Sequence, residues 1–386
     1  MKQRHYIALP VFLLGIVLHA WGGSSMEKLF QPFVDSGRMA GAVVLVADVE
    51  KLLALEAVGY ADLTERRPMK TDALFWIASQ TKTITAAGIL LLLDEGKLSL
   101  DDPVEKYLPE FKGIKVEIKH EGAGSTFRTP SREITIREIL SHTSGVVGGH
   151  RYYDLNLRVA DIVAEIAKGP LDYDPGSNYK YSGAGFSTAG RIIEVVSGKS
   201  YAEFLQARLF DPLGMKQTTF WPTVEQQKEM ARAYHFPKDN EGIAPQLITD
   251  YRIAGELADR NRLTFPGGGL FSTAEEVALF LRMLLNRGAW KGQQILSESS
   301  VAEMAKIQTE DGKGGWLGGA AYGLGTEITK NGFGHEGAFK TEGWVEPDRK
   351  IVRVLLVQIE GRYPYTKELK EAFARYTDEV LRSVNH

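Results

Sequence analysis

Apolar stretches near both ends of the chain predict the strands of one sheet. Residues 42–47 form a continuous run of small and β-branched side chains, residues 52–60 form a second run, and the mainly polar residues 48–51 between them predict a hairpin turn. Asn331-Gly332 is a strong hairpin signal, and a run at residues 351–359 has the apolar density of a central strand. These patterns predict an antiparallel sheet to which both chain ends contribute.

The middle of the chain has a helical pattern instead. Apolar positions recur every three or four residues in five segments: 84–93, 159–167, 187–196, 201–209 and 274–285. Residues 113–133 depart from this pattern and predict a hairpin or loop insertion ahead of a helix at Ile136. Residues 369–381 carry an apolar stripe at helical spacing, which predicts a final helix that covers the sheet.

Together the patterns predict an α/β (α+β) fold, in which helices flank an antiparallel sheet and a mostly helical domain is inserted into the sheet domain. We expect a discontinuous sheet domain at residues 23–78 and 265–386, and a mostly helical domain at residues 79–264. A cleft between two such domains is the default place for a binding site.

The N-terminus has the layout of a secretory signal peptide over residues 1–22. Lys2 and Arg4 precede an apolar run at residues 6–18, and small residues follow. The alternative is an uncleaved membrane anchor, but the run is shorter than the ~20 apolar residues that a spanning helix needs. We therefore expect a secreted or periplasmic protein with no stable membrane span after the signal is cleaved.

Charge and composition narrow the classes of partner and cofactor. A formal net charge of -3 over 386 residues gives no global basic field, which argues against nucleic acid or an anionic membrane surface as the main partner. The chain has no cysteine, which excludes disulfide bonds, thiolate metal sites and a cysteine nucleophile. His120-Glu121 and His335-Glu336 each lack the second histidine of a zinc-binding HExxH motif. We expect neither a metal nor a cofactor, and no oligomeric state is predicted.

Ser79 and Lys82 are the candidate nucleophile and its basic partner. Ser79 stands where an apolar run meets the amphipathic segment 81–93, so we expect it at or just inside the N-terminus of a helix. A spacing of three residues puts both side chains on one helix face, where the amine can take the hydroxyl proton. Ser25–Lys28 and Ser177–Lys180 share the spacing but not this setting. From the local context alone, an ordinary helix cap followed by a solvated lysine is an equally weighted alternative.

The stretch from Phe75 to Leu108, FWIASQTKTITAAGILLLLDEGKLSLDDPVEKYL, resembles the core signature of the penicillin-recognising serine hydrolases. Within that family it resembles the branch of class C β-lactamases, D-alanyl-D-alanine carboxypeptidases, D-aminopeptidases and related esterases. Further resemblances follow in family order at residues 136–145, 176–198, 268–276 and 334–338. The resemblance implies a β-lactamase-like fold and a cofactor-independent mechanism in which Ser79 forms an acyl-enzyme with Lys82 as its basic partner.

The second family motif is a tyrosine, any residue, then an asparagine, and the matching residues here are Tyr181-Ser182-Gly183. The resemblance implies a catalytic role for Tyr181, whose hydroxyl beside the lysine ammonium would share the Ser79 proton and later protonate the leaving group. Gly183 replaces the asparagine, whose carboxamide would hold the lysine and grip a substrate amide. Tyr179 is an alternative candidate for the same role, and a packing role for Tyr181 stays open.

His335-Glu336-Gly337 fits the His-any-Gly form of the third motif, which occurs in the peptidase and aminopeptidase branches. The resemblance implies that His335, Gly337 and Ala338 bind substrate. The histidine would orient the substrate or tune the proton network by its charge, and the glycine would let the substrate backbone approach closely. The Ala338 amide would join that of Ser79 in stabilising the oxyanion. We interpret His142 as a loop-structuring residue.

These features predict an exported serine hydrolase whose substrate is a small-molecule ester, an amide or a cell-wall peptide. Glycine at position 183 has no carboxamide that could bind a substrate amide. We therefore rank an esterase or D-amino-acid peptidase activity above a β-lactamase activity. The alternative is a non-catalytic, penicillin-binding-like sensor or binding domain that kept the fold and lost turnover. Gly183 supports this alternative, whereas the four retained motif residues Ser79, Lys82, Tyr181 and His335 oppose it. The chain has no G-x-S-x-G nucleophile elbow, which argues against an α/β-hydrolase.

Overall fold

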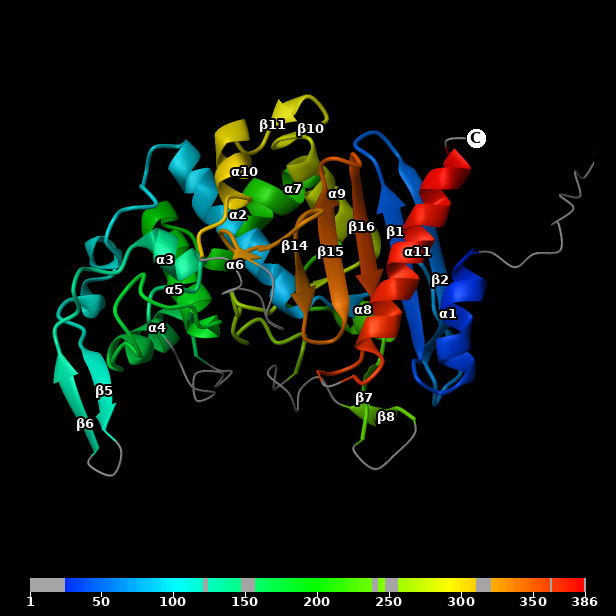
Figure 1. Cartoon of the computed structure of the whole chain (residues 1–386), viewed down its shortest axis with the longest axis horizontal. Helices are drawn as coiled ribbons and strands as arrows, with labels where there is room; N and C mark the ends of the chain where they lie inside the picture. Colours follow the sequence, from blue (N-terminus) through cyan, green and yellow to red (C-terminus); the bar gives the residue numbers. More distant parts are fainter. Residues whose placement is uncertain are drawn as a thin grey trace, which may run out of the picture.

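An antiparallel sheet built from both ends of the chain lies at the centre of the fold (Figure 1). The computed structural model describes residues 25–120, 124–146, 157–237, 242–246, 256–309, 321–361 and 363–384. Within these residues the sheet has eight strands in the order β12-β13-β14-β15-β16-β1-β2-β3. The strands are β1 (Gly41–Ala47), β2 (Leu52–Asp62), β3 (Arg67–Pro68), β12 (Ala321–Tyr322), β13 (Glu327–Thr329), β14 (Gly332–Gly337), β15 (Thr341–Glu346) and β16 (Ile351–Leu356).

The two chain ends meet where β1 pairs with β16. Val43 lies opposite Leu356, and the other edge of β16 pairs with β15. The run predicted at residues 351–359 is therefore a central strand, although the strand ends at Leu356. Turns join β1 to β2 at residues 48–51 and β13 to β14 at residues 330–331, close to both predicted hairpin positions. The predicted antiparallel sheet flanked by helices is confirmed.

Strand β1 is buried at all seven positions, which shows that both faces of the sheet are covered there. Alternate side chains of a strand point to opposite faces, and those of Val43 and Leu45 enter the core shared with α2 (Thr81–Asp94) and α9 (Ala274–Leu285). The side chains of Val44 and Val46 enter a second core under α1 (Ser25–Asp35) and α11 (Thr366–Val384). Figure 1 shows α11 lying across the strands as the predicted final helix.

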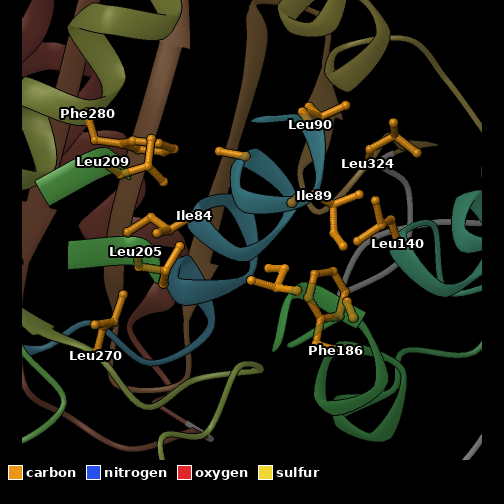
Figure 2. Packing of buried hydrophobic residues seen from close by; sticks show 14 of the residues in the cluster. Ile84, Ile89, Leu90, Leu140, Phe186, Leu205, Leu209, Leu270, Phe280 and Leu324 are labelled. Atoms are coloured by element: carbon orange, nitrogen blue, oxygen red, sulfur yellow. The ribbon is translucent and has the colours of Figure 1, made fainter. Parts of the chain in front are cut away.

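Helix α2, which begins at the predicted site, is buried almost all round. Twelve of its fourteen residues are buried. Figure 2 shows its side chains among residues of several other elements, including Leu140, Phe186, Leu205, Leu209, Leu270, Phe280 and Leu324. A Cβ atom added to Gly88 would lie 2.9 Å from Cδ1 of Ile193, so glycine lets α5 (Gly183–Ser197) approach α2 closely. The helix is therefore held rigidly from several sides.

The remaining elements are short. The helices are α3 (Ile136–Leu140), α4 (Val159–Ala167), α6 (Tyr201–Leu205), α7 (Asp211–Leu213), α8 (Val224–Lys228) and α10 (Glu298–Met304), and the small strands are β4 (Phe75–Trp76), β5 (Val116–His120), β6 (Gly124–Arg128), β7 (Ala233–His235), β8 (Ala244–Gln246), β9 (Phe271–Ser272), β10 (Ala289–Trp290) and β11 (Gln293–Gln294). The helices expected at residues 159–167 and 274–285 have the predicted bounds. The segment expected to be helical at residues 201–209 changes to a π-helical turn after Leu205.

The insertion at residues 113–133 contains a hairpin, because β5 and β6 pair with each other. The division of the chain into a sheet domain and a mostly helical domain stays a prediction. The predicted signal peptide at residues 1–22 lies outside the described residues. Among the helices that the structure describes, none is both long enough and apolar enough to cross a membrane.

Candidate active site

The turn that carries Ser79 is held in a strained conformation. Strand β4 leads into a 3-10 turn at Ala78–Gln80 that continues directly into α2, so Ser79 lies at a helix N-terminus as predicted. Ala78 has a φ of 47°, a left-handed conformation that costs a non-glycine residue about 1–3 kcal/mol. Its carbonyl accepts a hydrogen bond at 2.7 Å from the hydroxyl of Thr81, which itself accepts one at 3.2 Å from the Leu270 amide. These bonds fix the position of the half-buried Ser79.

Lys82 brings its amine to Ser79 inside the protein. Its Nζ lies 3.1 Å from Oγ of Ser79, although only 2% of the lysine is exposed. The amine also donates a hydrogen bond to the carbonyl of Gly267. Nζ lies 4.6 Å from the ring centroid of Tyr181 and 5.6 Å from that of Phe186. A carbonyl and two aromatic faces stabilise a buried ammonium, so the predicted nucleophile and its basic partner are in contact.

The family resemblance implies that an asparagine at position 183 would hold the lysine amine, but glycine stands there. The carbonyl of Gly267 holds the amine of Lys82 instead. A Cβ atom added to Gly267 would lie 3.4 Å from Cα of Gly183 and 2.7 Å from the ring of Phe265, so the two glycines lie close together. Residue 183 supplies no carboxamide here, and a main-chain carbonyl contacts the amine instead. The lysine is therefore held, whereas the group that would grip a substrate amide is absent from position 183.

Tyr181, rather than the alternative Tyr179, lies beside the amine. The Tyr181 ring centroid is 4.6 Å from Nζ of Lys82. The ring of Tyr179 lies instead beside those of His142 and Tyr322, with centroids 5.8 Å apart in each case. The structure thus brings the three predicted catalytic side chains together, and this geometry favours Tyr181 for proton transfer.

His142 fixes the main chain on both sides of Tyr181. It is 2% exposed, and its backbone has a φ of 62°. Its Nδ1 accepts a hydrogen bond from the Ser182 amide at 3.0 Å, and its carbonyl accepts one from the Lys180 amide at 3.0 Å. The His142 ring centroid lies 4.4 Å from that of Tyr181. His142 therefore structures the loop that carries Tyr181.

Strand β14 places the third motif against the turn that carries the predicted nucleophile. The hydroxyl of Thr341 donates a hydrogen bond to the Ile77 carbonyl at 3.1 Å. A Cβ atom on Gly337 would lie 2.6 Å from the same carbonyl oxygen and 3.4 Å from Cβ of Ala78, so only glycine fits this approach without movement. Ala338 follows directly and is half-buried. Gly337 and Ala338 therefore lie beside the turn that carries Ser79, and their role in binding substrate stays a prediction.

His335 is enclosed by the protein. It is 2% exposed, its Nε2 lies 3.0 Å from the Tyr322 hydroxyl and 3.5 Å from the Tyr181 hydroxyl, and its Nδ1 lies 2.6 Å from the Glu336 carbonyl. Burial, with the Lys82 charge as a smaller cause, lowers the pKa of His335 to about 3. His335 is thus neutral near pH 7, and we expect it to act by hydrogen bonding through Tyr181 rather than by charge or direct substrate contact.

Two residues of the site lie outside the sequence predictions. Gly267 supplies the carbonyl to Lys82, and the run of three glycines at residues 267–269 is a signal of close main-chain approach that could have identified it. Tyr322 contacts both His142 and His335, at 3.2 Å and 3.0 Å. It had no comparable signal, because its strand has two residues and reaches β14 only through β13.

Comparison with known proteins gives matches over most of the chain. The beta-lactamase family model matches residues 26–375. Lovastatin esterase of Penicillium rubens is 31% identical over 278 residues, which cover 67% of this chain and 68% of that protein. Esterase EstB of Burkholderia gladioli is 28% identical over 317 residues, which cover 75% of this chain and 77% of that protein.

The fold also matches solved structures. Unliganded simvastatin synthase (LovD) from Aspergillus terreus, as its selenomethionyl derivative, is similar with a TM-score of 0.76 at 22% sequence identity. The match covers 92% of this chain and 97% of that one. A likeness at this identity supports the same arrangement of helices and strands.

Replacing Gly337 by alanine should push β14 away from the Ser79 turn. The added Cβ would lie 2.1 Å from Oγ1 of Thr341 and 2.6 Å from the Ile77 carbonyl oxygen. We expect a destabilisation of about 1–3 kcal/mol and a loss of at least about tenfold in the rate at which a fluorophosphonate labels the protein. Thermal melting and labelling kinetics measure the two effects. Gly242→Ala is the control, because among the described residues its Cβ would meet one atom, the Gly37 carbonyl oxygen at 3.4 Å; equal results for the two variants would contradict the prediction.

Acid should destabilise the protein through its two buried histidines. Burial, followed by nearby positive charge, lowers the pKa of His142 well below its usual value and that of His335 to about 3. Each unfolded histidine binds a proton near pH ~6.5 and each folded one does not, so the free energy of unfolding should fall as pH drops below about 6.5. The expected slope is at most about 1.4 kcal/mol per pH unit for each histidine. Denaturant unfolding between about pH 7.5 and 4.5 measures it.

Substitution identifies the source of this slope. His335→Gln should lower it by about half, because His142 keeps its own contribution, while His120→Gln, at an exposed position on the β5–β6 hairpin, should leave it unchanged. Burial raises the pKa of Glu342, so this carboxyl stabilises the fold at low pH and loses that effect as pH rises through its folded pKa. Its contribution is common to all variants and cancels in the comparison. A slope that survives His335→Gln unchanged would refute the assignment to this residue.

Proposed function

The chain belongs to the beta-lactamase family of serine hydrolases, and we propose that it hydrolyses esters through an acyl-enzyme formed on Ser79. The observation that carries this proposal is the distance of 3.1 Å between the Ser79 hydroxyl and the buried amine of Lys82. A serine hydroxyl is a weak nucleophile until an adjacent base takes its proton. The buried amine is close enough to do so in its unprotonated form, which is the form that enters the acylation step.

In the proposed acylation step, Oγ of Ser79 attacks the ester carbonyl carbon and forms a new carbon–oxygen bond. The hydroxyl proton passes to the unprotonated amine of Lys82, and Tyr181 relays a proton from there to the leaving oxygen. The amides of Ser79 and Ala338 stabilise the negatively charged oxygen. The bond to the alcohol oxygen then breaks, and the alcohol leaves with that proton. Water attacks the acyl-enzyme, which releases the carboxylic acid and restores the Ser79 hydroxyl.

The preference for esters rests on position 183. Gly183 offers no carboxamide to a substrate amide, and the Gly267 carbonyl near it is a partner of the lysine. The names of the similar proteins lovastatin esterase and esterase EstB support the same preference. A D-amino-acid or cell-wall peptide is the second candidate substrate, because His335-Glu336-Gly337 has the form found in peptidase branches. A β-lactam ranks below both.

A non-catalytic sensor is the competing proposal. It would form the acyl-enzyme and then fail to release it, so the two functions differ in deacylation rather than in the first step. The close contacts of Lys82 with Ser79 and Tyr181 support acylation in either case, so they oppose only a module that binds without covalent chemistry.

Ser79→Ala should abolish covalent labelling by a fluorophosphonate and lower the turnover of a p-nitrophenyl ester by at least about a thousandfold. The physical reason is that Ser79 supplies the hydroxyl that lies 3.1 Å from the buried amine. Gel fluorescence after labelling and the release of p-nitrophenol measure the two effects. A panel that adds the matching anilide, a D-alanyl peptide and a chromogenic cephalosporin ranks the substrate classes.

Ser177→Ala is the matched control, because Ser177 and Lys180 have the same spacing in an exposed turn. This variant should label and turn over like the wild type. Labelling retained by Ser79→Ala would remove Ser79 as the nucleophile. A wild-type protein that labels at Ser79 but turns over no member of the panel would favour the sensor.

Export is the second part of the proposal. Lys2, Arg4 and the apolar run at residues 6–18 support a cleaved signal. When the full chain carries a C-terminal tag in a bacterial host, we expect tagged protein outside the cytoplasm that has lost about the first 22 residues, as N-terminal sequencing would establish. Leu13→Arg combined with Leu14→Arg should keep the chain inside the cell. Uncleaved protein in the membrane fraction would instead indicate an anchor.

A further inference from the structure

Three buried side chains link the loop after α3 to strands β12 and β14. His142, Tyr322 and His335 are 2%, 0% and 2% exposed. Nε2 of His142 lies 3.2 Å from the hydroxyl oxygen of Tyr322, and that oxygen lies 3.0 Å from Nε2 of His335. This row of hydrogen bonds passes beside Tyr181, whose hydroxyl lies 3.5 Å from Nε2 of His335.

The partners at the two ends of the row fix where its protons lie. The Ser182 amide donates to Nδ1 of His142 at 3.0 Å, so in the neutral ring Nε2 carries the proton. The Glu336 carbonyl, 2.6 Å from Nδ1 of His335, can only accept, so Nδ1 of His335 carries the proton and Nε2 is an acceptor. The Tyr322 hydroxyl therefore accepts a hydrogen bond from His142 and donates one to His335.

This assignment requires all three groups to be uncharged, and their surroundings ensure it. Burial is the main cause that lowers the pKa of both histidines, and the Lys82 charge adds to it. Burial also raises the pKa of Tyr322 well above its usual value. None of the three groups therefore changes its charge near pH 7, and the direction of each hydrogen bond is constant.

We propose that Tyr322 is a positioning residue for the acyl transfer: its O–H occupies the acceptor site of His335 and so keeps the Tyr181 hydroxyl available to relay the Ser79 proton to the leaving oxygen. A neutral imidazole has one ring lone pair, and the Tyr322 hydroxyl is closer to it than the Tyr181 hydroxyl, at 3.0 Å against 3.5 Å. Without the Tyr322 hydroxyl, Tyr181 would donate its proton to His335 and could no longer relay a proton to the leaving oxygen. This inference rests on the proposed function.

Tyr322→Phe tests the role by removing one oxygen and keeping the ring. We expect the maximal acylation rate, measured as the pre-steady-state burst of p-nitrophenol from an ester, to fall at least about tenfold. The ester concentration that gives half of that rate should change little, because the buried hydroxyl does not touch substrate. A merely structural role would not separate these two quantities.

Tyr376→Phe is the matched control. Tyr376 lies on α11 and is 0% exposed, in the core on the other face of the sheet. Its hydroxyl donates a hydrogen bond to Oε1 of Glu56 at 2.6 Å. The control therefore loses an equally buried hydroxyl far from the site, and its burst should match the wild type. Equal bursts for Tyr322→Phe, Tyr376→Phe and the wild type would overturn the proposal.

A double-mutant cycle with His335→Leu tests whether Tyr322 acts through His335. Leucine removes the acceptor nitrogen, so adding Tyr322→Phe to it should cause no further loss of acylation rate. Losses that multiply across the two substitutions would overturn the proposal. If His335→Leu does not fold, the comparison of Tyr322→Phe with Tyr376→Phe decides the question alone.

The same measurements separate this inference from the proposed function. A wild-type protein without a burst, or a burst that survives Ser79→Ala, would refute the acyl-enzyme on Ser79. A wild-type burst that Ser79→Ala abolishes and Tyr322→Phe leaves unchanged would refute only the positioning role.

Discussion

The burial of the Lys82 amine is the interaction on which the rest of the site depends. Removing an ammonium from water costs several kcal/mol, and the Ser79 hydroxyl, the Gly267 carbonyl and the Tyr181 ring offset that cost. These partners come from the start of α2, the glycine run before β9 and the loop before α5. The amine is therefore held in place only when three distant segments have folded together, so the geometry needed for proton transfer is a product of tertiary structure and not of the helix alone.

The same charge governs the neighbouring rings. A second positive charge close to a buried ammonium is unfavourable, and with burial as the larger cause this lowers the pKa of both His142 and His335. The site therefore combines one cation with neutral hydrogen-bonding groups. Because neutral imidazoles have one donor and one acceptor each, their partners give every hydrogen bond a definite direction. The lysine charge thus helps to keep both histidines neutral.

Much of the fold and the central pair of the site follow from local patterns. Strand β1 was predictable because it is apolar at every position, and the contact of Ser79 with Lys82 follows from a three-residue spacing at the start of a helix. Gly267 and Tyr322 were not predictable in this way. The first acts through its carbonyl on a lysine 185 positions away in the sequence, and the second stands on a strand of two residues. Neither a main-chain contact nor so short a strand has a periodic pattern.

Close main-chain approach also explains why the turn before Ser79 is strained. Ala78 adopts its φ of 47° directly after two residues that are fixed by hydrogen bonds: the Trp76 indole donates to the Gly268 carbonyl at 2.6 Å, and the Ile77 carbonyl accepts from Thr341 at 3.1 Å. The strain, about 1–3 kcal/mol, is borne once, when the protein folds. The nucleophile then enters each reaction already in position, so no part of that cost is added to the barrier of the chemical step.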